Sequence, residues 1–416
     1  MMRKTLLAWA FGLATIAVAA RAAEAPAEIK LGTLYASSGR YASISMPVHL
    51  GLKLWVDQKN AEGGAFIKAF NKKIPLKLVV YDDQSNTGTA ATLYNQLITQ
   101  DKVDVLISDS GSVLTSVAVP IARDNKMLLI DQTGTGAAFF TPDNPYIVLI
   151  ADPVSSIWPK PLADFLTHDG PPLGIKRVAM IYATNDFTGT QATAVRRFIG
   201  EAKSSGVELV YDNGVPTDTA NYAVLINNIR AANPDAVIHL GYAPNDIAFL
   251  RSLADSGGRF KMLFCIYPGL ETELLEKNVG DTGLNGIYTY VTASEIAYQT
   301  EWGMSLADFK KAWDAKYADG KVEFGFNSVA GYTTGLVVEK ALAVADSLDQ
   351  LALRKAIFSV SGKLKTLDGT FALDENGAQI GEITPLGQLV SDGGHIKFVT
   401  LWPPDVATGK PLYPAP

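Results

Sequence analysis

The sequence predicts an α/β protein made of two lobes, each a doubly wound parallel sheet, joined by a hinge. Its 416 residues exceed what one ordinary hydrophobic core accommodates, which favours two domains. Nearly continuous apolar strands alternate with amphipathic helices, and this pattern is typical of a parallel sheet covered on both faces. The alternation stops at a proline-rich stretch and then restarts, so the same βαβ theme is used twice.

The first 22 residues predict a signal peptide. Arg3 and Lys4 precede an apolar run over residues 6–20 that is too short to span a bilayer comfortably. Residues 20–22, Ala-Arg-Ala, fit a cleavage site, and residues 23–25, Ala-Glu-Ala, are a second candidate. We therefore expect an exported protein.

Charge and cysteine content indicate where the protein is located and which classes of partner it binds. Cleavage after residue 22 removes Arg3, Lys4 and Arg21 and takes the formal charge from −6 to −9, so nucleic acid is not an expected partner. The single cysteine, Cys265, lies in an apolar run, where it is expected to be a small buried hydrophobe. Since no lipid-attachment cysteine stands at the cleavage point, retention of the exported chain requires an outer membrane. We expect a periplasmic address.

The first lobe's elements follow in order after the signal peptide. Residues 29–34 read as a strand, and Val48, Leu52, Trp55 and Val56 mark one face of the next helix, which ends near Gly63-Gly64. We then expect a strand over 74–81, a helix around 91–98, a strand over 103–108, a helix through 122 and a strand over 127–130.

A stretch rich in proline, residues 141–172, breaks this rhythm and is expected to be a crossing between lobes. The second lobe is then predicted from strands at 177–182, 207–211, 236–240, 263–266 and 287–290, with helices to about 203, over 223–232 and to 254. Helices over 306–317, 329–345 and 350–358 come next, followed by strands with hairpin turns at 374–377 and 392–394.

No pattern of catalytic, metal or cofactor chemistry stands out. The four histidines, His49, His168, His239 and His395, have no metal-ligand spacing, and neither a nucleophile elbow nor a nucleotide-phosphate loop is present. Gly134-Thr135-Gly136 begins like a dinucleotide fingerprint, but Phe139 stands at its third glycine and it follows the fourth strand of the lobe. Asp82-Asp83, at a strand end, is better explained as a helix N-cap. We expect no enzyme activity, no cofactor and no metal.

Small polar residues at strand ends indicate a ligand site instead, because open parallel sheets bind ligands at the carboxyl ends of their strands. Ser110-Gly111-Ser112 precedes a helix, so Ser112 offers a hydroxyl beside free backbone N–H groups at a positive helix end. That arrangement binds a carboxylate. Thr133-Gly134-Thr135 adds donors at the same edge. Simple N-capping explains Ser112 equally well from spacing alone.

Ordered motifs along the mature chain carry a family likeness. Residues 29–64 read I-K-L-G-T-L-Y-A-S-S-G…W-V-D-Q-K-N-A-E-G-G; later come V-D-V-L-I-S-D-S-G-S at 103–112, Pro120-Ile121-Ala122 and L-G-Y-A-P-N-D…F-L-R at 240–251. Together they resemble the leucine/isoleucine/valine-binding proteins of ABC importers. The resemblance implies the two-lobed type I periplasmic-binding fold and capture of a small molecule by lobe closure, as a monomer, for an inner-membrane ABC permease.

The resemblance also implies an arrangement of lobes and site residues. We expect lobe 1 at 27–148 plus 290–360, lobe 2 at 149–289 plus 361–402, and a C-terminal tail at 403–416, after the signal peptide at 1–22. Ser112 and Thr135 then grip the ligand carboxylate with the backbone around Thr133 and Gly134, while Phe187 and Tyr242 cover the ligand from the second lobe.

One departure from the family bears on the ligand. Members that bind α-amino acids usually carry a glutamate after the strand that ends here at residue 266, and this chain reads Tyr267-Pro268-Gly269, with Glu271 and Glu273 farther on. An ammonium buried without an anion costs several kcal/mol. We therefore expect an uncharged-tail carboxylate, an aromatic or branched organic acid, with Tyr267 and Pro268 in the wall. A branched-chain or other hydrophobic amino acid is the alternative, as is a sensory subunit without transport.

Overall fold

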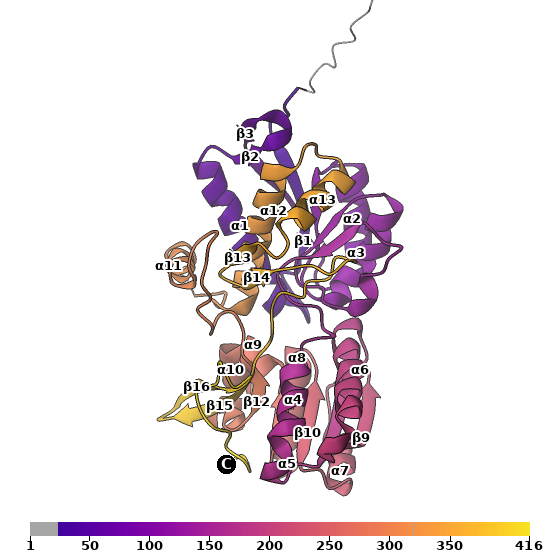
Figure 1. Ribbon diagram of the computed structural model, residues 1–416, viewed down its shortest axis with the longest axis vertical. Helices are drawn as coiled ribbons and strands as arrows, with labels where there is room; N and C mark the ends of the chain where they lie inside the picture. Colours follow the sequence, from indigo (N-terminus) through magenta and orange to yellow (C-terminus); the bar gives the residue numbers. More distant parts are fainter. Residues whose placement is uncertain (1–23, 319) are drawn as a thin grey trace, which may run out of the picture.

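The computed structural model describes residues 24–318 and 320–416, arranged as two lobes one above the other along the long axis (Figure 1). The predicted signal peptide, residues 1–22, lies outside the described residues. Each lobe is built on its own sheet, so the predicted two-lobed α/β architecture is confirmed.

The first lobe contains a five-stranded parallel sheet in the order β4-β1-β5-β6-β7. Its side chains alternate between two cores: Leu106 packs beneath α2 and α3, while Val105 and Ile107 pack beneath α1 and α12. Because the central strands are buried on both faces, they are rich in apolar residues. The strands are β1 (Ile29–Tyr35), β4 (Leu76–Asp82), β5 (Val105–Ile107), β6 (Leu129–Asp131) and β7 (Ile147–Leu149). The helices are α1 (Ala42–Ala61), α2 (Thr87–Thr99), α3 (Ser112–Asp124), α11 (Leu306–Lys316), α12 (Phe326–Val344) and α13 (Gln350–Val360).

The second lobe contains a seven-stranded sheet in the order β16-β15-β12-β11-β10-β8-β9. Its first five strands along the chain are parallel: β8 (Arg177–Ala183), β9 (Glu208–Val215), β10 (Ala236–Leu240), β11 (Leu263–Cys265) and β12 (Tyr288–Tyr290). An antiparallel hairpin of β15 (Leu386–Asp392) and β16 (His395–Trp402) extends the edge, and its turn is the one predicted at 392–394. The helices are α4 (Lys160–His168), α5 (Gly170–Leu173), α6 (Asp186–Glu201), α7 (Ala223–Ala231), α8 (Ala243–Asp255), α9 (Tyr267–Leu270) and α10 (Thr272–Leu284).

The two sheets repeat one topology. Numbered along the chain within each lobe, the parallel strands lie in the order 2-1-3-4-5 in both, which is a doubly wound arrangement. In such a sheet the strand order reverses beside the first strand, and ligands bind outside the carboxyl ends of the strands at that point. In the first lobe this is the edge where β1 and β5 end.

Three segments connect the lobes and lie side by side. They follow β7, β12 and β14 (Gly369–Phe371). Hydrogen bonds tie them together: Val154 N to Gln379 O (2.8 Å), Val291 N to Pro385 O (2.8 Å) and Thr384 Oγ1 to Trp158 O (2.9 Å). These crossings form the hinge.

Three local features differ from the sequence-based expectation. The proline-rich stretch 141–172 contains β7, the last strand of the first sheet, together with α4 at the start of the second lobe. A short hairpin of β2 (Ala65–Ile67) and β3 (Lys72–Ile74) was not predicted.

The third difference is a lobe boundary. The hairpin of β13 (Leu364–Thr366) and β14 buries Leu364 and Phe371 in the core of the first lobe. The chain therefore returns to the second lobe beyond residue 371, later than the boundary expected at 361. The C-terminal tail lies against the second lobe, where Leu412 N donates to Gln388 Oε1 (2.8 Å).

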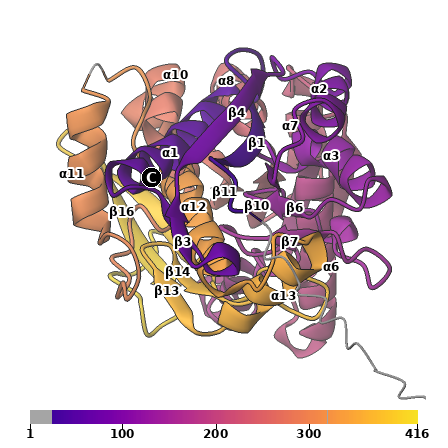
Figure 2. The same ribbon diagram turned by 90° about the horizontal axis from the view of Figure 1, so that it is seen from above.

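Helices α1 and α12 pack unusually closely, along what we call the α1–α12 seam (Gly51, Gly331 and Gly335 with the residues they touch). A Cβ added to Gly331 would lie 1.9 Å from the carbonyl oxygen of Val48, so the two backbones are in contact. Seen from above, the two helices lie side by side in the first lobe (Figure 2).

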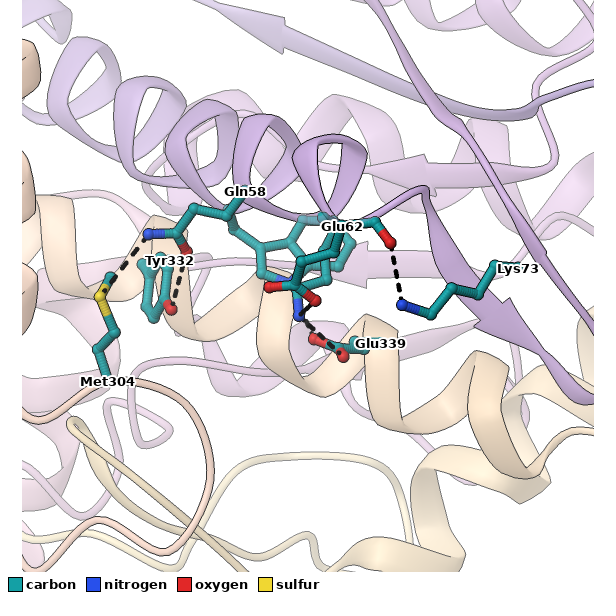
Figure 3. Close-up of polar contacts among 8 residues, drawn as sticks. Gln58, Glu62, Lys73, Met304, Tyr332 and Glu339 are labelled. Atoms are coloured by element: carbon teal, nitrogen blue, oxygen red, sulfur yellow. Dashed lines mark hydrogen bonds and ion pairs between the residues drawn. The ribbon is translucent and has the colours of Figure 1, made fainter.

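Polar contacts fasten the outer half of this seam (Figure 3). The Tyr332 hydroxyl donates to Gln58 Oε1 (3.2 Å), and Lys59 Nζ pairs with Glu339 Oε1 (3.3 Å). Trp55 Nε1 also donates to Glu339 (3.2 Å). The polar side chains at the seam therefore have partners.

Within the described ranges, none of the helices combines the length and apolar character that a membrane span requires. Cys265 is buried and makes no disulfide, as expected for a small core residue.

Candidate ligand-binding site

Residues of both lobes line a small cavity at the strand ends of the first sheet. Five of the eight predicted ligand-binding residues meet there: Ser112, Thr133, Phe187, Tyr242 and Tyr267. The other lining residues are Ile44, Ser110, Gly111, Asp152, Trp158, Leu270, Phe326 and Asn327. The cavity measures about 20 Å³, room for about one water molecule. A larger ligand therefore requires the lobes to separate.

The start of α3 supplies the anion-binding groups. Gly111 is the N-cap, with φ 79°, a backbone angle that suits glycine, and no side chain caps the helix. Ser112 is the first helical residue, and its Oγ accepts a hydrogen bond from Gly136 N (3.1 Å). The N-capping explanation for Ser112 is therefore wrong. Its own hydroxyl proton remains available for a ligand.

Thr133 adds a second hydroxyl beside the helix start. Its Oγ1 accepts from Gly111 N (2.9 Å) and lies 2.9 Å from Ser110 Oγ. These contacts hold the loops after β5 and β6 together, so Ser110, Ser112 and Thr133 all line the cavity.

Three predicted residues stand behind the cavity rather than in its wall. Gly134 N donates to Asp131 Oδ1 (2.8 Å), Thr135 Oγ1 lies 2.5 Å from Ser155 Oγ, and Pro268 lies in α9. Thr135 thus ties the first lobe to the first hinge segment. Ligand contact by these three residues remains a prediction.

Aromatic rings form the opposite wall. Phe187, at the start of α6, lies 5.4 Å from Tyr242, and Tyr242 lies 5.8 Å from Tyr267 (ring centroids). Trp158, which sequence reasoning missed, packs edge-on against Phe187 at 5.3 Å. Edge and tilted contacts of this kind add to apolar burial. The available signal for Trp158 was a large aromatic in the expected lobe crossing.

Tyr242 reaches from the second lobe to the start of α3. A Cβ on Gly111 would lie 3.4 Å from the Tyr242 hydroxyl oxygen, so the phenol touches the helix start. Burial raises the pKa of Tyr242, and the nearby Tyr41 raises it further, while the backbone N–H groups of Val113 and Ser112 oppose this rise. The hydroxyl makes no hydrogen bond of normal geometry. The Tyr242 hydroxyl therefore lies against the start of α3, in the wall of the cavity.

Buried carboxyl groups were also missed. Asp152, in the first crossing, is 3% exposed and its Oδ1 has no hydrogen-bond partner. Burial raises its pKa well above the usual range, and the charges of Asp368 and Asp131 add to the effect. Burial likewise raises the pKa of Asp131 to about 7. No lysine or arginine is among the described residues that line the cavity, so no cation in this wall offsets the cost of ionising Asp152.

A buried polar pair positions Tyr267. Asp246 Oδ2 accepts from Tyr267 N (2.7 Å), and Asp246 Oδ1 lies 2.6 Å from His239 Nδ1. Cys265 lies nearby, with its possible ligand atom within 4.8 Å of both. The histidine spacing in the sequence did not reveal this group, which strand pairing of β10 with β11 brings together. A short His–Asp hydrogen bond explains the contact without a metal.

Comparison with protein families gives one match over most of the chain. Residues 28–394 match the family described as periplasmic binding protein. A Leu/Ile/Val-binding protein homolog from Brucella melitensis is 25% identical, over 98% of this chain and 99% of its own length.

Solved structures share the fold. The branched-chain amino acid transporter substrate binding protein LivJ from Streptococcus pneumoniae, in complex with isoleucine, aligns with a TM-score of 0.72 at 18% identity, covering 90% of this chain and all (100%) of LivJ. An ABC transporter solute binding protein from R. palustris, in complex with benzoate, aligns with a TM-score of 0.67 at 18% identity, covering 90% of this chain and 96% of that one. These likenesses establish the type I periplasmic-binding fold.

Proposed function

The chain belongs to the periplasmic binding protein family, and we propose that it captures a small carboxylate-bearing ligand between its lobes for an ABC permease. As a member of this family it is a solute-binding protein and not an enzyme. The family implies a periplasmic location.

The start of α3 carries this proposal. Its first residues, Gly111 and Ser112, line the cavity together with Ser110 and Thr133, which add two further hydroxyl groups. A helix N-terminus with free N–H groups and a partial positive charge favours an anion, the more so where water is excluded. The isoleucine of the S. pneumoniae relative and the benzoate of the R. palustris relative both carry a carboxylate on an apolar tail.

The aromatic wall and Asp152 favour an aromatic or branched organic acid. The rings of Trp158, Phe187 and Tyr267 enclose apolar surface. A protonated Asp152 donates a hydrogen bond to a carboxylate but offers no charge to an ammonium group. A ligand that is uncharged where it contacts this wall therefore fits best.

Asp152 also supports a second candidate, a hydrophobic amino acid. An α-ammonium beside Asp152 would stabilise the ionised carboxylate and replace the glutamate missing after β11. Asp152→Asn separates the two candidates, because asparagine still donates to an acid but cannot pair with an ammonium. Binding of benzoate or 4-methylpentanoate should survive the substitution, and binding of leucine should be lost.

A thermal-shift screen of such acids against leucine and valine tests the proposal. A ligand at one hundred times its dissociation constant stabilises the folded protein by about 2.7 kcal/mol. Shifts with the amino acids and none with the simple acids would reverse our ligand preference. No shift with any carboxylate would contradict the proposed function.

Ser112→Ala tests the role of the helix start. We expect acid binding to weaken by about 1–3 kcal/mol in calorimetric titration. The unfolding temperature should fall as well, because Gly136 N loses its acceptor, but the protein should still unfold in one cooperative transition. Ser116→Ala is the matched control, because Ser116 lies on the same helix and donates only to Val113 O (2.8 Å). Equal affinities of the two variants would remove Ser112 from the site.

Reconstitution with the permease distinguishes transport from sensing. A transport subunit, expected to act as a monomer, should stimulate ligand uptake into proteoliposomes that contain the permease. A sensory subunit of the same fold would bind the ligand without stimulating uptake.

A further inference from the structure

A second and larger cavity opens beyond the ligand site, also between the lobes. It measures about 510 Å³ and is lined by the start of α1 and residues 320–327 on one side and by α9 and α10 on the other. Leu270, Phe326 and Asn327 line both cavities, and we call these three residues the neck. The second cavity, which we call the Glu271 compartment, therefore adjoins the ligand site.

Glu271 is the distinctive group of the compartment. It is 5% exposed, and neither of its carboxylate oxygens has a hydrogen-bond partner of normal geometry. It occupies the N-cap position of α10 without capping the helix. Its polar neighbours are Ser43 and Asn327, both from the first lobe. Burial raises the pKa of Glu271 to about 8, and the charge of Glu323 adds to this.

Charged residues surround Glu271: Lys277, Lys321, Glu273 and Glu323 line the same compartment. Glu273 is exposed and pairs with Lys277 at 3.6 Å, and Glu323 accepts from the backbone N–H of Glu273 (3.3 Å). Among the described residues, no lysine or arginine forms an ion pair with Glu271. A carboxylate removed from water without a cation is disfavoured, even where Ser43 and Asn327 offer hydrogen bonds. A ligand that brings a cation to this position would relieve that cost.

We propose that the Glu271 compartment receives a basic nitrogen at the far end of the ligand whose carboxylate binds the start of α3. This inference rests on the proposed function and specifies its ligand class: an acid that is apolar within the aromatic wall and cationic beyond the neck. The side chains of Ser43 and Asn327 adjoin Glu271, and each carries an oxygen that can accept from the remaining N–H groups of an ammonium. Because the neck separates the two ends, the ligand is longer than a simple α-amino acid.

Two isosteric probes test this on the mature wild-type protein. 4-(Aminomethyl)benzoate carries an ammonium where 4-ethylbenzoate carries a methyl group. We expect calorimetric titration to give at least tenfold tighter binding of the amino compound. Tighter or equal binding of 4-ethylbenzoate would overturn the inference and leave the proposed function intact. Failure of both probes, together with all the simple acids, would overturn both.

Two variants test whether Glu271 causes the preference for 4-(aminomethyl)benzoate over 4-ethylbenzoate. Glu271→Gln should reduce the affinity ratio of the two probes to about one, whereas Glu273→Gln, which removes an equal charge from an exposed and paired position, should preserve it. An unchanged ratio in Glu271→Gln would overturn the inference. The wild-type comparison needs no variant, so it decides the matter even if Glu271→Gln does not fold.

A last experiment measures the unfolding temperature of the protein with calcium or magnesium and no organic ligand. If either ion raises the unfolding temperature of the wild type and Glu271→Gln abolishes that rise, the compartment binds a metal ion and the inference is wrong. We expect neither ion to change the unfolding temperature of the wild type.

Discussion

The α1–α12 seam and the cleft between the lobes are both buried, but they differ in whether their buried polar groups have hydrogen-bond partners. In the seam, Trp55, Gln58 and Tyr332 have hydrogen-bond partners, and glycines bring the backbones into contact. In the cleft, Asp152 and Tyr242 have polar atoms without partners. Buried polar atoms without partners are costly, so they mark a surface selected for something other than stability. The seam is therefore closely packed with its named polar groups paired, whereas the cleft leaves polar groups available to a ligand.

The largest expected effect comes from opening the seam. Gly331→Ala places a Cβ 1.9 Å from the Val48 carbonyl oxygen, and this neighbour is backbone that cannot rotate away. Overpacking usually costs about 1–3 kcal/mol, and we expect at least about 4 kcal/mol here because the two helices must separate. Urea denaturation measures the change in the free energy of unfolding.

Gly189→Ala is the control for this substitution. Gly189 lies in α6, and a Cβ there meets nothing within 4 Å. Alanine should stabilise the helix by about 0.5–1 kcal/mol. A loss below about 1 kcal/mol for Gly331→Ala would show that the seam is not closely packed.

The sequence predicted the sheets better than the cleft because hydrophobic periodicity is a local signal. Apolar runs identified β1, β5 and β8, and two βαβ series implied two lobes. β7 was missed because its three residues stand among prolines. Leu364 and Phe371 were assigned to the wrong lobe because an apolar side chain does not specify which of two cores it enters.

The site divides in the same way. Ser112 and Thr133 could be predicted because small polar residues at the ends of parallel strands share one edge of a sheet. Asp152 and Trp158 come from a lobe crossing, and Phe326 from a distant helix start. Their meeting depends on how the lobes are placed, and no local pattern records that.

The second prediction concerns pH and the cleft edge. Asp131, at the end of β6, is fully buried, and burial raises its pKa from 3.8 to about 7. An acid with a raised folded-state pKa contributes full stability below pH 4, loses it as the pH rises to about 7, and changes no further above that. Asp131→Asn cannot ionise, so relative to the wild type it should gain up to about 4 kcal/mol between pH 4 and pH 8. Denaturation of both proteins across this range measures the difference.

Asp143→Asn is the control, because its effect on the free energy of unfolding should change with pH in the opposite direction. Asp143 is exposed, and the hydroxyl of Thr141 holds its pKa below the usual value. Its ionised form is therefore the stabilised one, and its substitution should cost stability as the pH rises. A parallel response of the two variants would mean that Asp131 is not buried in an unfavourable environment.

The smallest and sharpest prediction applies one chemical change to both regions. Tyr332→Phe in the seam removes a hydroxyl that donates to Gln58 Oε1 at 3.2 Å, and should cost about 1 kcal/mol of unfolding free energy. Tyr242→Phe in the cleft removes a buried hydroxyl without a partner, and should be neutral or stabilise the protein by up to about 1 kcal/mol. Parallel denaturation curves of the two variants measure both values. If Tyr242→Phe costs as much as Tyr332→Phe, its hydroxyl is bonded to the amides at the start of α3, and the contrast between seam and cleft fails at the point where the ligand carboxylate is expected to bind.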